Sequence, residues 1–370
     1  MAIKLSIGSA VYNIEPSFLR AHIEGVQRQL TDETEFLLID DCSTNDSAKI
    51  CREYADSDSR IRYIEMEQNG GLSRVRNRTI EEAAGKWIFF ADADDLLSEY
   101  FVQTALRFCD CDQDIIIHDR LKFTTQKQTE TPCEETELIT FPENAGRALS
   151  ISCLCLDPTL GKQFGLSQYA FYHAAWGMLY RRDFLVENDL LFPAGQKKAQ
   201  DSVFNTDVYF CAKKIAYLPY KMYYYRTNPG GITQRYSTDF PQMAESLLGH
   251  LNRRLETLYA NDGDVKERYL NHRLMALVMD NMRLNIFHKD NPKPENERKR
   301  DFLAFIESEP YKSAILNFDP VKSGRFEWHL PAVLIRKKQF RLLNMFMGNH
   351  TALGILCGVD KRFMKLLKSK

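Results

Sequence analysis

The segment FFADADD, from Phe89 to Asp95, is an apolar run that ends in three carboxylates. The apolar part predicts a buried strand, and the acids after it place negative charge at the carboxyl edge of a sheet. A divalent cation that bridges a nucleotide diphosphate binds oxygen ligands of this type. Aspartates are also good caps for a helix, here one predicted to start near Ser98, so this segment alone leaves both interpretations open.

Further segments around this run alternate between strand-like and helix-like patterns. Their order is strand, helix, strand, helix, strand, helix, strand within about a hundred residues, which predicts an α/β fold with a mostly parallel sheet and a ligand at the strand ends. The strands are predicted at Leu5 to Asn13, at Phe36 to Ser47 with a break at Asp40 and Asp41, and at Ile61 to Glu65, followed by a loop at Gln68 to Asn77 and a helix at Thr79 to Trp87.

Four ordered motifs in the first hundred residues carry a resemblance to a known family. The sequence resembles family 2 glycosyltransferases of the GT-A fold, a Rossmann-like nucleotide-sugar-binding fold, over roughly residues 3 to 235. The motifs are AVYN, LIDDCSTNDS, NGGLSRVRN and FFADADD, and later matching segments are Trp176 to Leu185, Leu190 to Phe204 and Tyr223 to Thr233. The family commonly has VDDGSTDDS where this sequence has LIDDCSTNDS.

The chain of 370 residues is long for one core, which predicts a catalytic domain with an appended module. We place the catalytic domain at residues 1–236 and a helical C-terminal region at residues 237–370. In this region, Glu245 to Ala260 and Leu270 to His288 show apolar residues at three- and four-residue spacing, as in helices. The polar segment from His288 to Asp301 predicts an exposed loop.

The last fifty residues are basic, with eleven Lys or Arg against two acids from Val321 to Lys370. Pro331 to Gly348 and Lys361 to Lys370 mix these basic residues with aliphatic ones at near-helical spacing. Such segments either lie on an anionic membrane surface, as a peripheral attachment, or pack as ordinary helices with the basic face in water. Nucleic-acid binding is disfavoured, because the chain as a whole carries a net charge of only -1.

The start of the chain enters a predicted strand at once and lacks the apolar region of a signal peptide. We therefore expect a cytoplasmic protein, with the inner face of the membrane as a location for any peripheral attachment. Nine cysteines, an odd number, favour reduced thiols over disulfides. The pairs Cys109 with Cys111 and Cys153 with Cys155 leave a zinc site as the weaker alternative to burial as small apolar side chains.

The resemblance assigns roles to the three acids of FFADADD. It implies that Asp94 is a metal ligand and that Asp92 lies toward the ribose and the metal. Asp95 would support the loop or contribute to the sugar site. Mg²⁺ or Mn²⁺ suits an oxygen-rich site that also recruits phosphates.

The resemblance also implies a nucleotide site, with Ala10, Tyr12 and Asp41 at the nucleobase and Tyr12 stacking on its ring. A carboxylate only accepts hydrogen bonds and uracil offers an imide N–H, so Asp41 favours UDP over GDP. Asp40 either contributes to this site or only caps the following loop. Cys42 departs from the glycine usual in the family.

Arginines supply the cationic partners that a diphosphate needs. Arg74, Arg76 and Arg78 follow the glycine pair, and Arg226 follows a run of tyrosines. Since some of the first three must point to solvent on a helix, we expect only one of them at the diphosphate and choose Arg74, together with Arg226.

Inverting transfer needs a carboxylate that takes the proton from the acceptor hydroxyl. The resemblance places Asp201 at this position, with Gln200 where the family usually has glutamate. The alternative is that Asp201 only caps the helix that follows. Trp176 is either a platform for an acceptor sugar or a packing residue.

These motifs together predict an inverting glycosyltransferase that moves a sugar from a nucleotide sugar to a hydroxyl of a glycan or lipid-linked glycan. The UDP-sugar donor, the Mg²⁺ or Mn²⁺ and the capsule or lipopolysaccharide setting are implications of the resemblance. A catalytically silent glycan-binding module on the same fold is the first alternative. A nucleotidyltransferase is the second, although no Gly-rich phosphate loop follows the first strand.

Overall fold

The computed structural model describes residues 2–123, 136–157, 159–227 and 235–347. The chain divides into two compact units, which we describe separately. One unit consists of residues 1–153 and 158–228, and the other of residues 154–157 and 229–370. The predicted division lay between residues 236 and 237, so the helical unit of the structure begins a little earlier and also includes residues 154–157.

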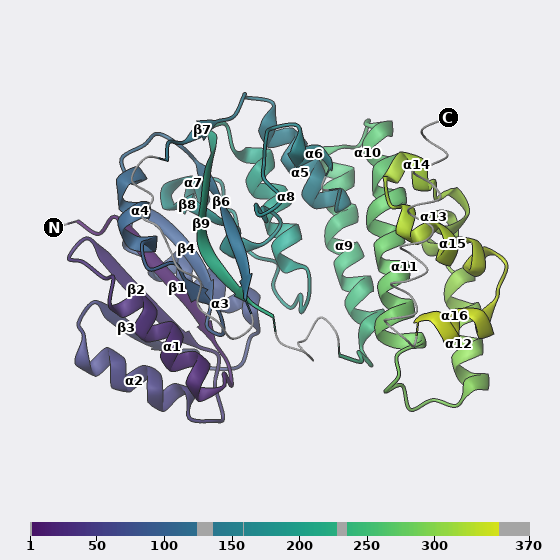
Figure 1. The fold of residues 1–370 in the computed structure, drawn as a ribbon, viewed down its shortest axis with the longest axis horizontal. Helices are drawn as coiled ribbons and strands as arrows, with labels where there is room; N and C mark the ends of the chain where they lie inside the picture. Colours follow the sequence, from purple (N-terminus) through teal and green to yellow (C-terminus); the bar gives the residue numbers. More distant parts are fainter. Residues whose placement is uncertain (1, 124–135, 158, 228–234, 348–370) are drawn as a thin grey trace. The chain divides into compact units, whose positions relative to one another are not determined.

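The first unit is built on a mixed sheet to which nine strands of the described residues belong (Figure 1). The strand order is β3-β2-β1-β4-β8-β6-β9-β5, and β7 pairs with β9. The four strands from β3 to β4 are parallel, whereas β8 is antiparallel to both of its neighbours. The strands are β1 Leu5–Val11, β2 Thr34–Asp40, β3 Ile61–Glu65, β4 Trp87–Asp92, β5 Leu96–Leu97, β6 Ile115–Phe123, β7 Ile139–Thr140, β8 Met178–Arg181 and β9 Ile215–Arg226.

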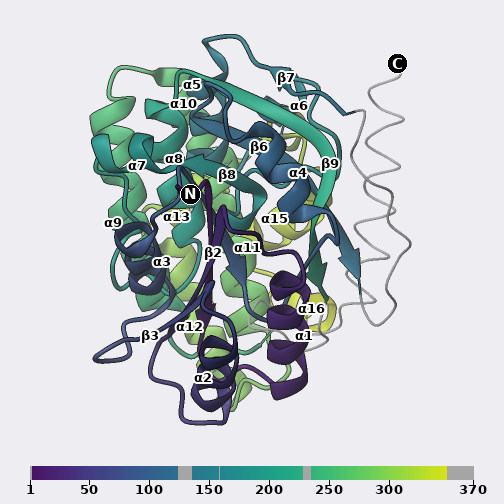
Figure 2. The same cartoon turned by 90° about the vertical axis from the view of Figure 1, so that its left-hand side faces the viewer.

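Helices cover both faces of this sheet, which confirms the predicted α/β class. Helices α1, α2 and α4 lie on one face and α3, α7 and α8 on the other (Figures 1 and 2). The helices of the unit are α1 Pro16–Gln27, α2 Ser47–Ser57, α3 Leu72–Glu82, α4 Phe101–Phe108, α5 Ala145–Cys155, whose last two residues belong to the other unit, α6 Thr159–Lys162, the 3₁₀ turn η1 Ala175–Gly177, α7 Arg182–Glu187 and α8 Gln200–Cys211.

Two apolar clusters sandwich the sheet because successive side chains of a strand point to opposite faces. In β2, Phe36 and Leu38 belong to one cluster and Leu37 and Ile39 to the other. Every residue of β2 is buried. A strand covered on both faces is apolar at consecutive positions, which is why this segment is recognisable in the sequence.

Helix α3 begins earlier than the sequence predicted. It starts at Leu72, inside the segment predicted as a loop, and it ends at Glu82, before the predicted end at Trp87. Gly71 precedes it with a φ of 76°, a conformation that glycine adopts without strain. The first buried positions of α3 are Ser73, Val75 and Arg76, so two polar residues conceal the helical apolar spacing there.

The second unit is helical. Its longest element, α9, covers the predicted helix at residues 245–260, and the pattern at residues 270–288 forms η2, α11 and η3. The predicted loop at His288 to Asp301 was too long, because α12 already begins at Glu295. The elements are α9 Phe240–Leu258, α10 Gly263–Arg268, η2 Tyr269–Leu274, α11 Met275–Asn281, η3 Met282–Ile286, α12 Glu295–Glu307, α13 Tyr311–Asn317, α14 Pro320–Ser323, η4 Phe326–Trp328, α15 His329–Arg336 and α16 Phe340–Met347.

The first basic amphipathic segment packs within the second unit. Ile335 of α15, with Phe340 and Leu343 of α16, lies buried in a cluster with α11 and α12. These apolar side chains are therefore covered, although Leu342 and Met345 of α16 are exposed, and the packing supports the packed-helix alternative there. The second segment, Lys361 to Lys370, lies outside the described residues. Throughout the described stretches, no helix combines the length and apolarity needed to cross a bilayer.

Two glycine substitutions test the packing of the first unit. We expect Gly85→Ala to lower the free energy of unfolding by about 1 to 3 kcal/mol, because its Cβ would lie 2.6 Å from the backbone nitrogen of Ser6. Gly25→Ala is the matched control, since it lies in α1 with nothing within 4 Å of the added carbon. Alanine is a better helix former than glycine, so Gly25→Ala should raise the free energy of unfolding by up to about 1 kcal/mol. Urea unfolding followed by tryptophan fluorescence measures both, and equal effects would contradict this account.

Candidate active site

The candidate site lies where β1, β2 and β4 end at the same edge of the sheet. Ala10 stands opposite Asp92 across the β1 and β4 pair, and Val11 stands opposite Asp40 across the β1 and β2 pair. The parallel register therefore brings the ends of three predicted motifs together. This edge is where open α/β sheets bind their ligands.

Arg76 is the residue that joins the predicted metal motif to the predicted base. Its side chain is buried and pairs with Asp92 at 2.9 Å and with Asp201. Asp92 ends β4 and Asp201 lies in the first turn of α8, so this guanidinium connects groups that are far apart in the sequence. Burial alone would lower the pKa of Arg76, but Asp201 and Asp92 outweigh burial and raise it.

Asp92, Asp94 and Asp201 form an acidic cluster, and its negative charge is only partly neutralised. Burial raises the pKa of Asp92 to about 6; Arg76 opposes this rise, and repulsion from Asp94 and Asp201 adds to it. Burial also raises the pKa of Asp94, although the charge of Arg226 lowers it. Perturbed carboxylates that converge at a sheet edge are typical of functional sites.

The three acids of FFADADD face different surroundings. Asp94 is half-buried, and across the described parts of the chain its carboxylate has no ion pair or hydrogen bond to another side chain. Asp95 is buried; it accepts a hydrogen bond of 2.6 Å from the Tyr223 hydroxyl and one of 2.6 Å from the Arg226 backbone N–H. Asp95 therefore supports the loop, as one of its two predicted roles required, whereas Asp94 is open to a ligand.

Arg226, which we predicted at the diphosphate, lies beside Asp94. Its Nε donates to the Asp94 carbonyl at 2.7 Å. The guanidinium also stacks over the rings of Phe18, at 4.1 Å, and Phe123, at 4.7 Å. Two aromatic rings and one carbonyl thus hold the planar cation in place, and its charge remains available for an anion.

Sequence reasoning missed His22, which anchors the acidic loop from α1. Its Nδ1 lies 2.9 Å from the carbonyl oxygen of Asp95, and its Nε2 lies 2.8 Å from the Ser9 hydroxyl. A carbonyl only accepts, so Nδ1 carries the proton and Nε2 accepts from Ser9. Burial lowers the pKa of His22 to about 4, which keeps the ring neutral. A lone histidine in an apolar helix pattern carries no signal that could have shown this role.

The predicted nucleobase residues lie at the ends of β1 and β2. Tyr12 is half exposed, at 50%, which leaves its ring available for stacking. Asp41 is buried, and its two carboxylate oxygens accept the backbone N–H groups of Gly70 at 2.7 Å and Gly71 at 2.8 Å. Asp41 therefore orders the glycine loop before α3. Asp40 accepts from the Ser43 N–H, as its predicted capping role required.

Arg76, and not Arg74, is the arginine that reaches the acidic cluster. Arg74 is exposed and lines a separate cavity of about 520 Å³ with Glu65 and Asn77. Arg78 forms surface ion pairs within its own helix. Arg76 thus lies on the side of α3 that faces the acids, and the choice of Arg74 for the diphosphate stays a prediction.

Asp201 is held by two partners at the start of α8. Besides its pair with Arg76, it accepts the backbone N–H of Ala175 at 3.1 Å. Its side chain retains 19% exposure, so it is not sealed from a ligand. Among the described residues, Asp201 makes no capping bond to its own helix, whose capping position is Ala199 with a φ of 58°. Asp201 is therefore not the capping residue of α8, and its role as a base stays a prediction.

Trp176 is a packing residue. Its ring stacks on Tyr223 at 4.6 Å and on Phe171 at 5.4 Å, and only 5% of it is exposed. An acceptor platform needs an open ring face. Trp176 instead fixes Tyr223, whose hydroxyl holds Asp95.

The cysteines of the two predicted pairs show no metal geometry. Cys109, Cys153 and Cys155 are buried and Cys111 is partly buried, and all four are unbridged. Within the described ranges, no group of three or more His, Cys, Asp or Glu side chains could hold a metal by itself. This holds also for the acidic cluster, so a cation there would need ligand oxygens in addition to the carboxylates.

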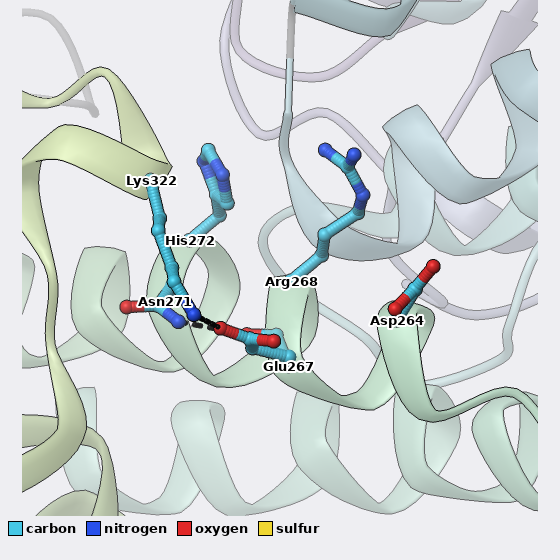
Figure 3. Close-up of a pocket in the computed structure, with 6 residues that line it drawn as sticks. All are labelled: Asp264, Glu267, Arg268, Asn271, His272 and Lys322. Carbon is cyan, nitrogen blue, oxygen red and sulfur yellow. Dashed lines mark hydrogen bonds and ion pairs between the residues drawn. The ribbon is translucent and has the colours of Figure 1, made fainter.

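The helical unit contains a polar cavity of about 300 Å³ (Figure 3). Its charged groups already have partners, because Lys322 pairs with Glu267 at 2.7 Å and Arg268 pairs with the buried Asp157 at 2.8 Å. Asn271 accepts the backbone N–H of Asp319. These contacts connect α10 with α14 and with Asp157, and η2 with the start of α14, so we interpret the cavity as structural.

A family model supports the resemblance. The model described as Glycosyl transferase family 2 matches residues 6–184, which contain β1 to β4 and the acidic motif. Residues 6–184 form a family 2 glycosyltransferase domain. The predicted resemblance is thereby confirmed, and the family 2 domain lies within the first compact unit except for residues 154–157.

Relatives extend beyond this domain to different degrees. "Uncharacterized glycosyltransferase EpsJ" of Bacillus subtilis (strain 168) is 31% identical over 233 residues, which are 62% of this chain and 63% of EpsJ. "Uncharacterized glycosyltransferase YibD" of Escherichia coli (strain K12) is 28% identical over 87% of this chain and 89% of YibD. The match to EpsJ thus spans less than two thirds of that relative.

The fold is similar to that of a solved glycosyltransferase structure. The structure of S. aureus TarS 1-349 in complex with UDP-GlcNAc has a TM-score of 0.60 over 95% of this chain and 92% of that chain. The sequence identity is 17%, so the likeness concerns the fold alone. It confirms the predicted α/β sheet with a helical C-terminal region.

The buried neutral state of His22 predicts a pH dependence of stability. Its folded pKa of about 4 lies below the value of about 6.5 in an unfolded chain, so its contribution is complete above pH 6.5 and is lost as the pH falls toward 4. At pH 5 the loss is about 2 kcal/mol. Between pH 7.5 and pH 5, we expect the free energy of unfolding to fall by about 2 kcal/mol more in the wild type than in His22→Gln. Urea titrations at both values measure it, and parallel curves for both proteins would contradict it.

Proposed function

We propose that the protein is an inverting glycosyltransferase that moves a sugar from a UDP-sugar to a hydroxyl of a glycan or lipid-linked glycan. The observation that carries this proposal is the double ion pair of Arg76, which joins Asp92 of the metal motif to Asp201, the candidate base. A transferase needs both groups within reach of one sugar, because the diphosphate leaves on one side of the sugar and the acceptor attacks on the other. A silent binding module would need no such arrangement.

The donor site is proposed at the ends of β1 and β2. Tyr12 would stack on uracil, beside the backbone of Ala10. Asp41 already accepts two backbone N–H groups, yet each carboxylate oxygen has a second lone pair that suits the imide N–H of uracil. UDP-GlcNAc binds to the structurally similar TarS, which supports a UDP-sugar here.

Asp94 and Asp92 would hold a Mg²⁺ or Mn²⁺ ion together with the diphosphate. The donor set fits, because the open Asp94 carboxylate and the partly neutralised Asp92 offer oxygen ligands and uncompensated negative charge. A bound cation would offset the negative charge that develops on the leaving diphosphate. Arg226 would bind the same diphosphate from the side of Phe18 and Phe123.

Asp201 would take the proton from the acceptor hydroxyl. Its Oδ1 pairs with Arg76 and its Oδ2 accepts from Ala175, so the carboxylate is held in one orientation. The second lone pair of Oδ2 would accept the hydroxyl proton as the oxygen attacks the anomeric carbon. Attack opposite the leaving diphosphate inverts the anomeric configuration. We place this reaction at the cytoplasmic face of a bacterial membrane, where lipid-linked glycans would be the acceptors.

Removing the open carboxylate tests the metal site. We expect UDP to bind wild-type protein more tightly with Mn²⁺ than with a chelator, and Asp94→Asn to lose most of this difference because an amide is a weaker ligand than a carboxylate. Calorimetric titration measures the affinities. Asp110→Asn is the control, since Asp110 is an acid whose side chain is 79% exposed. Equal UDP affinity of the wild type with and without metal would rule out this site.

Replacing the candidate base tests the chemistry. We expect Asp201→Asn to bind UDP normally and to slow transfer of the sugar to water by about 10² to 10⁴, because the amide cannot take a proton. Release of UDP from a panel of UDP-sugars measures this slow hydrolysis without any known acceptor. Asp183→Asn is the matched control, an exposed acid in the first turn of α7. Proton NMR of the first product should show the inverted anomer, and near-normal hydrolysis by Asp201→Asn would place the base elsewhere.

A further inference from the structure

Arg120 lies on β6 close to the candidate site and has no role in the reaction described above. It stands opposite Tyr223 of β9, the residue whose hydroxyl holds Asp95. The register between the two strands shifts on both sides of Asp119, where β9 has extra residues. Irregularities of this kind change the direction of a side chain and are frequent next to active sites.

The guanidinium of Arg120 is surrounded by aromatic rings. It lies 4.5 Å from the ring centre of Phe171, 5.7 Å from that of Trp176 and 5.8 Å from that of Tyr225. Trp176 and Tyr225 are themselves stacked at 5.5 Å. The rings hold the plane of the cation, and the edge of a guanidinium held in this way still carries its N–H donors.

No carboxylate pairs with Arg120 among the residues that the structure describes. Its Nε is buried and has no hydrogen-bond partner, and burial lowers the pKa of the guanidinium. Arg76, which is buried whereas Arg120 is partly buried, has two carboxylate partners. Aromatic contacts replace only part of the hydration that a cation loses on burial. Arg120 therefore carries an Nε–H donor with no hydrogen-bond partner among the described residues, and the charge of Asp95 offsets its positive charge only in part, since its pKa stays lowered.

The surroundings of Arg120 connect it to the candidate base. Trp176, which it contacts, directly follows Ala175, the residue whose N–H holds Asp201. The proposed diphosphate cation, Arg226, stacks instead on Phe18 and Phe123. Because the base must face the acceptor hydroxyl, the contact of Arg120 with this segment favours a place for its guanidinium on the acceptor side.

We propose that Arg120 binds an anionic group of the acceptor, a phosphate or a carboxylate, next to the hydroxyl that receives the sugar. This inference rests on the proposed function. A guanidinium binds either oxyanion through paired N–H donors, so phosphate and carboxylate share the recognising chemistry. The acceptor is thus an acidic glycan or a phosphate-containing one.

Binding of charged and neutral sugars tests this inference. The probes are glucose 6-phosphate, glucuronate and glucose, titrated by calorimetry at constant ionic strength into full-length protein saturated with UDP and Mn²⁺. We expect at least one anionic sugar to bind at least tenfold more tightly than glucose, and the better of the two identifies the anion. We expect Arg120→Gln to bring its affinity to the level of glucose. Arg120→Lys should keep part of the preference, since it retains the charge but not the paired donors.

Arg107→Gln is the matched control, because Arg107 is exposed and stacks on the ring of Phe108 at 5.2 Å. It should keep the full preference for the anionic sugar. Equal affinities of the wild type for all three sugars would overturn the inference, and so would a preference that survives in Arg120→Gln. The wild-type comparison decides the matter even if Arg120→Gln fails to fold.

The same preparations separate this inference from the proposed function. If the wild type neither binds UDP nor hydrolyses any UDP-sugar, the proposed function fails. If it does both but binds charged and neutral sugars equally, only the role of Arg120 fails.

Discussion

The ion pairs of Arg76 are the interaction on which the candidate site depends. One guanidinium bound to Asp92 and to Asp201 fixes the end of β4 relative to the start of α8. Breaking a buried ion pair by removing one partner costs about 3 to 5 kcal/mol, because the remaining charges lose their compensation. Here the loss of Arg76 would leave two carboxylates facing each other. The fold of the first unit and the geometry of its site are therefore coupled through one side chain, which α3 carries.

The three aspartates of the acidic motif are chemically identical but differ in burial and in their partners. Asp92 points toward Arg76, Asp95 turns inward to Tyr223, and Asp94 stays open. Asp95 can be buried because a hydroxyl and a backbone N–H satisfy its oxygens. His22 holds the same turn through the Asp95 carbonyl. The turn is thus fixed from two directions, so Asp94 keeps its position without a side-chain partner of its own.

The sequence predicted the sheet well and the contacts of the site less well. Strands buried on both faces are rich in consecutive apolar residues, so β2 and β4 were recognisable, and polar residues at their ends marked the site. Helix α3 was placed too late because Ser73 and Arg76 occupy buried positions that a periodic pattern assigns to apolar residues. For the same reason, Arg74 was chosen where Arg76 is the residue that reaches the acids. The role of His22 depends on contacts with residues distant in sequence, which no local pattern contains.

The uncompensated charges of the site have opposite signs in different places. Asp94 and the partly neutralised Asp92 present negative charge at the end of β4, whereas Arg120 presents positive charge beside the aromatic stack of Trp176. If these charges served only stability, they would pair with one another, because an unpaired buried charge is costly. Trp176, whose ring Arg120 contacts, stacks on Tyr223, and no ion pair joins Arg120 to the acids among the described residues. Such a separation suits two ligands of different character, a cation with its diphosphate at the acids and an anionic acceptor at the arginine.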